Sequence, residues 1–192
     1  MVLGSRSSSS IKNVGTEPIR ICTVGHSTRA ADEFAQLLAA HEIKLLVDVR
    51  SFPSSRRFPQ FNQKSLSTYL SQLRITYHHA PALGGRRQPN PDSLNTAWKN
   101  ASFRAYADYM ETPAFAEGIE SLLQMAREDR SAVMCAEALW WKCHRSLIAD
   151  YLKAMGVEVT HILSTDKTEI HPYTSAARVV QGKLSYRGLL EG

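Results

Sequence analysis

The chain of 192 residues has the length of one ordinary globular domain. Its composition, with 43% hydrophobic and 21% charged residues, excludes a disordered acidic chain, a collagen-like repeat and a membrane protein. No apolar run reaches the roughly 18 to 20 residues that span a bilayer, and the amino end lacks the apolar core of a signal peptide. We therefore expect a soluble, cytoplasmic protein.

The positive charge of the chain is concentrated in one segment. The whole chain carries a net charge of +5 at pH 7. Between Arg50 and Arg104 there are nine basic residues and one acidic residue, Asp92, so this segment carries +8 and the remainder carries −3. Such a concentration favours an anionic partner, and the alternative is a solvated surface with a chance excess of positive charge.

The first half of the chain alternates strand patterns with helix patterns. The Ser-rich run before residue 11 lacks apolar periodicity, so residues 1–17 are predicted to be a disordered tail and residues 18–192 a single α/β domain. Either Thr28 or Asp32 can cap the first helix. The predicted elements are strands over residues 19–24, 44–49 and 75–78, helices over 34–41 and 65–73, and a long loop over 80–100.

The second half continues the same alternation. Thr112 followed by Pro113 is typical of a helix start, and the helix is expected to run to about residue 127. The other predicted elements are strands over residues 131–135 and 157–163, a helix over 143–155 that Gly156 closes, and a hairpin over 178–186 that turns at Gln181-Gly182. This order predicts a mostly parallel, five-stranded sheet with helices on both faces, a Rossmann-like three-layer sandwich.

Each predicted parallel strand carries a titratable or hydrogen-bonding side chain at or near its carboxyl end. In open parallel sheets, ligands bind at this edge. For each histidine the alternative is a satisfied structural role, and for Asp48 it is a buried ion pair with Arg50 that orients the loop. The candidates of this kind are His26, Ser27, Asp48, Arg50, Tyr77, Cys135, Glu137 and His161.

The densest cluster joins Cys135 and Glu137 to the run Cys143-His144-Arg145. The first pair lies at a strand end, and the run lies in the first turn of the next predicted helix. A thiol at a helix amino terminus is stabilised as thiolate by the helix dipole, and an adjacent arginine adds to this effect. The same geometry can bind phosphate through free backbone amides, with the arginine as a clamp.

Three interpretations of this cluster remain open. In the first, Cys143 or Cys135 is a nucleophile, assisted by His26 or His144 and by Glu137. In the second, the two cysteines and one or more histidines bind zinc or iron, although the spacing is not that of a zinc ribbon. In the third, the cluster has no chemistry. With Cys22 the chain has three cysteines, too few for a disulfide framework, and we expect reduced thiols.

Several short motifs together resemble the family catalogued as domain of unknown function 488. The resemblance extends from about residue 19 to residue 186, and its most specific part is Cys-x-Glu-x5-Cys-His-Arg. It implies a single α/β domain with the motif residues at one site, and it implies no substrate. The motifs are Val24-Gly25-His26-Ser27, Asp48-Val49-Arg50, Leu83-Gly84-Gly85, Cys135-Ala136-Glu137, Cys143-His144-Arg145 and His161-Ile162.

The sequence predicts an enzyme, a Cys/His-dependent hydrolase or transferase, that acts on a phosphorylated or nucleic-acid-related anionic substrate. The alternatives are a non-catalytic nucleic-acid-binding protein and a metal-dependent enzyme or sensor. The expected partner is an anionic small molecule or nucleic acid and not a membrane, while the cofactor and the oligomeric state stay unidentified. The residues expected to bind the substrate are Ser27, Arg50, Tyr77, Gly84, Gly85, Arg86, Arg145 and His161.

Overall fold

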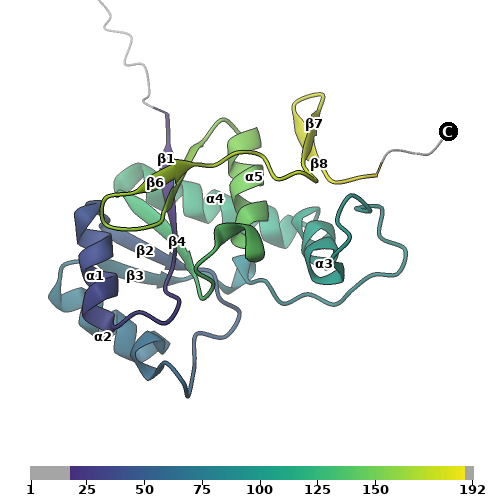
Figure 1. Ribbon diagram of the computed structural model, residues 1–192. Helices are drawn as coiled ribbons and strands as arrows, with labels where there is room; N and C mark the ends of the chain where they lie inside the picture. The colour runs from purple at the N-terminus through teal and green to yellow at the C-terminus, as the bar shows by residue number, and fades with distance from the viewer. Residues whose placement is uncertain (1–17, 189–192) are drawn as a thin grey trace, which may run out of the picture.

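Six strands form one mixed sheet in the computed structural model, which describes residues 18–188 (Figure 1). The sheet order is β3-β2-β4-β1-β5-β6, in which the first five strands are parallel and β6 is antiparallel to β5. The mostly parallel α/β architecture is therefore confirmed, with one antiparallel strand more than predicted. The strands are β1 (Arg20–Gly25), β2 (Leu45–Asp48), β3 (Thr76–His79), β4 (Ser131–Cys135), β5 (Glu158–Ile162) and β6 (Thr168–Ile170). The predicted tail over residues 1–17 lies outside the described residues.

The sheet order separates this protein from a Rossmann sheet. In a Rossmann sheet β1 lies directly beside β2, whereas here β4 lies between them. Gly25 allows β1 to end against the segment that follows β4, because a Cβ at this position would lie 1.8 Å from the carbonyl oxygen of Glu137. The backbone N–H of His26 then donates to the carbonyl of Cys135 at 3.0 Å, so the two strand ends are fixed to each other.

In the described part of the chain, five α-helices accompany the sheet, with α1 and α2 on one side and α3, α4 and α5 on the other (Figure 1). They are α1 (Ala31–Ala40), α2 (Gln63–Gln72), α3 (Ala101–Met110), α4 (Pro113–Glu128) and α5 (Arg145–Ala154). The Thr112 side chain caps α4 as predicted. The expected cap of α1 was wrong, because α1 begins after Ala30, whose N–H donates to the Glu33 carboxylate at 2.9 Å.

Helix α3 was not predicted, since it follows directly on the loop rich in Pro, Gly and Arg. Its cap is Asn100, whose side chain accepts hydrogen bonds from the N–H groups of Ser102 and Phe103. The helix buries Ala105, Tyr106, Ala107 and Met110. It therefore forms part of the wall of the core and also borders the loop before it.

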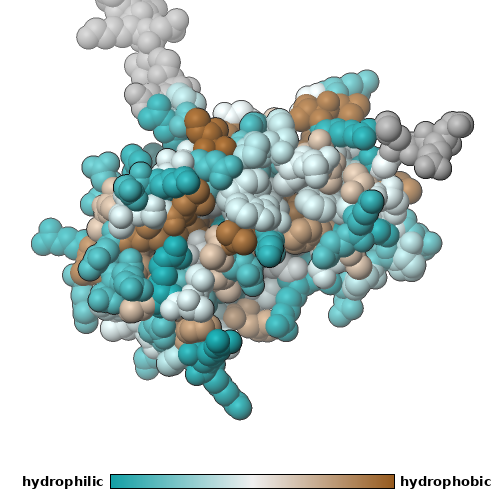
Figure 2. Space-filling model, viewed as in Figure 1, coloured by the Kyte–Doolittle hydropathy of each residue, from teal (hydrophilic) through white to brown (hydrophobic). Residues whose placement is uncertain are grey.

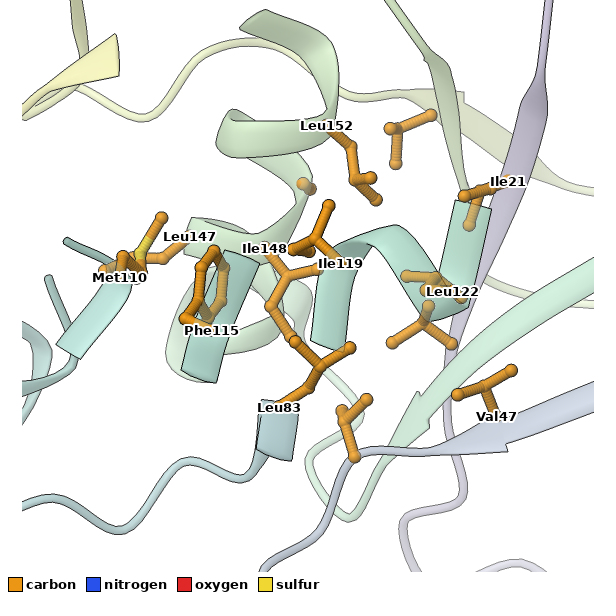
Figure 3. Close-up of a cluster of buried hydrophobic side chains, with 14 of the residues drawn as sticks. Ile21, Val47, Leu83, Met110, Phe115, Ile119, Leu122, Leu147, Ile148 and Leu152 are labelled. Atoms are coloured by element: carbon orange, nitrogen blue, oxygen red, sulfur yellow. The ribbon is translucent and has the colours of Figure 1, made fainter. Parts of the chain in front are cut away.

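Alternate residues of the central strands contribute to two hydrophobic clusters, one on each face of the sheet. Val47 packs into the cluster beneath α3, α4 and α5, while its neighbour Leu46 packs into the cluster beneath α1 and α2. Figure 3 shows the first cluster, in which Phe115 and Ile119 of α4 meet Leu147 and Ile148 of α5. Burial of these side chains on both faces is the main stabilising contribution and holds the strand ends in place.

A hairpin, β7 (Arg178–Val180) with β8 (Lys183–Ser185), forms a separate two-stranded sheet. Its turn is at Gln181-Gly182, as predicted, and both residues have positive φ angles. Val179 and Val180 are exposed on the hairpin, which is the brown area beside the carboxyl end in Figure 2. Within residues 18–188, no helix combines the length and the apolar character needed to cross a membrane.

Candidate functional site

The carboxyl ends of β1, β2 and β4 lie side by side in the sheet. The register pairs Gly25 of β1 with Cys135 of β4, and Asp48 of β2 with Met134 of β4. The loops after these strands therefore start from one edge, as the parallel arrangement predicted. The segment after Cys135 continues through a short 3-10 turn (Trp140–Lys142) to Cys143 and the start of α5.

A cavity of about 290 Å³ opens at this edge. It contains five of the predicted site residues, which are Gly85, Arg86, Glu137, Cys143 and His144. Five further lining residues were not predicted, namely Ser51, Phe52, Ser102, Phe103 and Lys142. The sequence signal for Ser102 and Phe103 was the Asn100 helix cap directly before them. For the other three, position next to a predicted residue was the only signal.

Cys143 and His144 form a thiol–imidazole pair in the cavity wall. His144 Nε2 lies 3.1 Å from the carbonyl oxygen of Val49, which can only accept, so Nε2 carries the ring proton and Nδ1 is an acceptor. That Nδ1 lies 3.4 Å from Cys143 Sγ. Burial, as the largest cause, lowers the pKa of His144 to about 4, so the ring is neutral at neutral pH. A neutral imidazole in this orientation can accept a thiol proton.

Gly85 is needed for this arrangement. A Cβ at Gly85 would lie 2.5 Å from His144 Nδ1, so the glycine backbone packs directly on the imidazole ring. Gly84, before it, packs on Ser51, whose Oγ accepts a hydrogen bond from the Arg86 N–H at 3.1 Å. The Gly-Gly-Arg loop is thereby held against the thiol–imidazole pair, and Arg86 is brought to the cavity.

Cys135 and Arg145 lie behind Cys143 and are almost fully buried. Arg145 Nη2 donates to the carbonyl oxygens of Glu137 and Ala138, at 3.2 and 3.3 Å. Arg145 Nε and Nη1 have no hydrogen-bond partner within residues 18–188. The Cys135 thiol also donates to the carbonyl of Glu137, at 3.9 Å. One carbonyl oxygen thus contacts both side chains.

The two thiols influence each other's ionisation. Burial opposes a charge on Cys135, but the neighbouring Cys143 thiol and the Arg145 guanidinium together lower the pKa of Cys135. The neighbouring Cys135 and then burial raise the pKa of Cys143. Because interacting groups titrate as a pair, the pair loses its first proton early and retains its second. The N–H of Arg145, at the start of α5, lies 3.5 Å from Cys143 Sγ and favours negative charge there.

A second polar cluster at the same edge is a closed network around Asp48 and Arg50. Arg50 Nε donates to Asp48 Oδ1 at 2.9 Å, Nη2 donates to the Phe61 carbonyl at 2.8 Å, and Nη1 lies 3.2 Å from His26 Nε2. Tyr77 donates its O–H to Asp48 Oδ2 at 2.6 Å. The expected Asp48–Arg50 ion pair is therefore present. Protein groups occupy all three guanidinium nitrogens, which favours the interpretation that the pair orients the loop after β2.

His26 takes part in this network as a neutral ring. Its ring stacks on Phe61 with 4.1 Å between centroids, and its Nδ1 lies 2.9 Å from the carbonyl oxygen of Ser27. Burial, followed by the charge of Arg50, lowers the pKa of His26 to about 4. Ser27 has a positive φ angle, and its N–H donates to Ala136. Neither His26 nor Ser27 lines the cavity that contains Cys143.

His161 lies apart from both clusters, within a buried chain of hydrogen-bonded polar side chains. Its Nδ1 lies 2.6 Å from Thr23 Oγ1, and its Nε2 lies 2.8 Å from His171 Nδ1. His171 Nε2 in turn lies 3.0 Å from Asp150 Oδ1 on α5. The Trp140 ring stacks on the His161 ring, with 4.3 Å between centroids. His161 therefore does not line the cavity, and Asp150 is a buried polar residue that sequence reasoning missed.

No group of three or more His, Cys, Asp or Glu side chains in the described part of the chain is arranged to hold a metal ion. The two cysteines and His144 are close together, but Cys143 is the residue that contacts the ring. The geometry of these side chains gives more support to thiol chemistry than to metal binding.

The fold and the site define an α/β protein with a thiol–imidazole pair at the carboxyl edge of a mostly parallel sheet. Residues 30–152 match the family described as Domain of unknown function DUF488, and the chain belongs to that family. The matched range is shorter than the resemblance over residues 19–186, and it leaves out His26, Ser27 and His161. Neither a comparison with curated proteins nor one with solved structures gives a match.

Proposed function

We propose that the protein is a cysteine-dependent hydrolase or transferase that acts on a phosphorylated or nucleic-acid-related anionic substrate. Cys143 is the nucleophile and His144 is its base. The observation that carries this proposal is the 3.4 Å contact between Cys143 Sγ and His144 Nδ1 in the wall of a cavity that also contains Arg86 and Lys142. The nucleophile, the base and the carbonyl that orients the base follow the logic of activated thiols.

The charges around the cavity support an anionic substrate. Arg86 and Lys142 are cationic and exposed at its rim, and Glu137 is the one acidic residue that lines it. Phe52 is 67% exposed, with the Arg86 guanidinium 5.4 Å from the centroid of its ring. An aromatic ring beside a guanidinium can stack on a base while the cations hold a phosphate. These features suit a phosphate ester with a planar group.

In this mechanism each group of the chain has one task. His144 Nδ1 accepts the Cys143 proton as the sulfur attacks the electrophilic atom of the substrate. The bond from that atom to the leaving group breaks, and the leaving group takes the proton from His144. The Val49 carbonyl keeps the opposite ring nitrogen protonated, so the accepting nitrogen faces the sulfur. The N–H of Arg145 stabilises the negative charge that develops on Cys143 Sγ as the proton leaves. The covalent intermediate is then released by water in a hydrolase or by a second acceptor in a transferase.

The test is the rate at which iodoacetamide alkylates Cys143 as a function of pH, followed by peptide mass spectrometry. The wild-type protein should be alkylated at Cys143 faster than a free thiol at neutral pH, because His144 Nδ1 accepts the Cys143 proton as the sulfur attacks. His144→Gln should slow this reaction, whereas Cys22→Ser should leave it unchanged. A Cys143 that reacts no faster than a free thiol in the folded wild-type protein contradicts the proposal.

A non-catalytic nucleic-acid-binding protein is the second candidate, and the exposed Phe52 beside Arg86 is the observation that favours it. Binding through Arg and Lys contacts to phosphates must weaken steeply with salt. A gel shift with single-stranded and double-stranded DNA and RNA at low and at moderate salt tests this candidate. Absence of a shift with every probe at low salt excludes it.

A further inference from the structure

Arg145 is a buried cation without a carboxylate partner. Its side chain is 1% exposed, and no Asp or Glu within residues 18–188 forms an ion pair with it. Two of its three guanidinium nitrogens, Nε and Nη1, have no partner there either. An isolated charge in a protein interior is strongly unfavourable, so a buried guanidinium requires an anion beside it.

The charge of Arg145 acts on four ionisable groups within residues 18–188, the two thiols and the rings of His144 and His161, and of these only the thiols can become anions. Arg145 Nη2 and Cys135 Sγ converge on the same carbonyl oxygen, that of Glu137, at 3.2 and 3.9 Å. The backbone N–H of Arg145 lies 3.5 Å from Cys143 Sγ. The charge of Arg145 favours the ionised form of each thiol. Ionisation of one of the two thiols would therefore supply the missing anion.

We infer that Cys135 and Cys143 form a dithiol redox centre that reduces low-molecular-weight disulfides, with Arg145 as the counter-ion of its thiolate. Cys143 lines the cavity and is the sulfur that an external disulfide reaches, whereas Cys135 lies behind it. Cys143 is thus the attacking thiol and Cys135 the resolving thiol. The inference shares Cys143 with the proposed function but requires Cys135 in a role of its own.

The reaction proceeds in two exchanges. In the first, Cys143 Sγ gives its proton to His144 Nδ1 and forms a bond to one sulfur of the disulfide RSSR, the S–S bond of RSSR breaks, and RS⁻ leaves with the electron pair. In the second, the Cys135 thiolate attacks Cys143 Sγ, and the mixed disulfide releases a second RS⁻. Two RSH molecules form after protonation, RSSR is reduced, and the protein gains one Cys135–Cys143 disulfide.

The experiment uses the full chain with oxidised glutathione as the disulfide. Cys22→Ser is the reference, because it removes the third thiol while leaving the pair intact. After incubation, free thiols are blocked by alkylation and the peptides are assigned by mass spectrometry. The reference should release two glutathione molecules per chain and contain a disulfide between Cys135 and Cys143. The double variant Cys22→Ser/Cys135→Ser should release one molecule and retain glutathione on Cys143.

Two outcomes overturn the inference. One is a reference protein that retains glutathione on Cys143 and forms no internal disulfide, since Cys135 then fails to resolve it. The other is a reference protein in which both thiols stay free. If Cys143 is still alkylated rapidly in these cases, the redox centre is rejected and the proposed function is retained. If the disulfide forms but Cys143 alkylation is no faster than that of a free thiol, the proposed function fails and the redox centre remains.

The role of Arg145 has a readout of its own, the pH profile of glutathione release. Arg145→Met should move the rising limb of this profile to higher pH by about one unit or more, because the thiolate loses its counter-ion. Arg145→Lys, which retains the charge, should move it less, and Arg130→Lys on the surface should not move it. A profile that is identical in Arg145→Met and in wild-type protein rejects the counter-ion role. Circular dichroism confirms that each variant is folded.

Discussion

His171 Nε2 lies 3.0 Å from Asp150 Oδ1, and neither side chain is accessible to solvent. Asp150 also accepts hydrogen bonds from the N–H and the Oγ1 of Thr174, at 2.9 and 2.6 Å, and from the Tyr186 O–H, at 2.8 Å. The Asp150 carboxylate thus holds the segment from the end of β6 to the end of β8 against α5 through hydrogen bonds. Trp140, three residues before Cys143 in the chain, contacts both histidines of this network.

Replacement of Asp150 should therefore destabilise the whole domain. Asp150→Ala leaves four donor groups, on His171, Thr174 and Tyr186, without an acceptor, and we expect the free energy of unfolding to fall by about 3 kcal/mol or more. Urea unfolding followed by circular dichroism measures this change. Glu120→Gln, on the exposed side of α4, is the matched control and should leave the midpoint unchanged. Equal midpoints for Asp150→Ala and wild type would disprove this role of Asp150.

Acid should weaken the fold through its buried neutral histidines. In the folded protein the pKa of His26 and that of His144 are lowered to about 4, mainly by burial, from an ordinary value of 6.5. The unfolded chain consequently binds more protons between these values. The stabilisation is complete above about pH 6.5 and is lost as the pH falls toward about 4, by about 3 kcal/mol for the buried His144.

Urea midpoints measured between about pH 8 and about pH 4.5 follow this loss. The midpoint should be steady at the upper end and decline on the acidic side. His144→Gln should decline less steeply than wild type, because one of the titrating rings is absent. A wild-type midpoint that stays constant through this acidic range contradicts the burial of neutral rings.

The packing of Gly85 on His144 can be tested by a double-mutant cycle. Gly85→Ala should destabilise the protein by about 1–3 kcal/mol and slow Cys143 alkylation, because the new methyl group displaces the imidazole. In the His144→Ala background the ring is absent, so the same substitution should have a much smaller effect. Urea unfolding and alkylation rates of the four proteins complete the cycle. Additive effects would show that Gly85 and His144 act independently.

The anion site should respond to the two rim cations. An anionic ligand such as inorganic phosphate or a nucleoside monophosphate should protect Cys143 from alkylation in the wild-type protein. Arg86→Gln or Lys142→Gln should weaken this protection about tenfold each, and added salt should weaken it further. Arg57→Gln is the control, since Arg57 packs on Phe58 and does not line the cavity. Equal protection in all four proteins would place the anion elsewhere.

The sequence predicted those helices, strands and turns whose apolar pattern, cap or turn residues lie within the element itself. Strand β4 has the predicted limits, α4 begins at the predicted cap, and the hairpin turns at Gln181-Gly182. Helix α3 and strand β6 were missed. The α3 sequence is short and only partly apolar, and β6 has three residues whose pairing with β5 is the main reason that it is a strand.

The candidate site was predicted in part for a similar reason. Parallel strands explain why Cys135, Asp48 and His26 start from one edge. Which of these side chains meet depends on contacts between distant segments. His161 contacts His171 in the core and not the cavity. The guanidinium nitrogens of Arg50 all have partners, which are Asp48, His26 and the carbonyl of Phe61. The sequence indicated the Asp48–Arg50 pair, but the contacts of Arg50 with His26 and Phe61 and that of His161 with His171 have no signature in sequence spacing.

The position of β1 determines how the protein can be divided. The matched family range begins at residue 30, after β1, and ends at residue 152, before β5. Yet β1 pairs with β4 on one side and with β5 on the other. A fragment cut at the limits of the match would expose the edge of β4 and leave Asp150 without Thr174 and Tyr186. The smallest unit suitable for expression as a domain therefore extends from β1 to Tyr186.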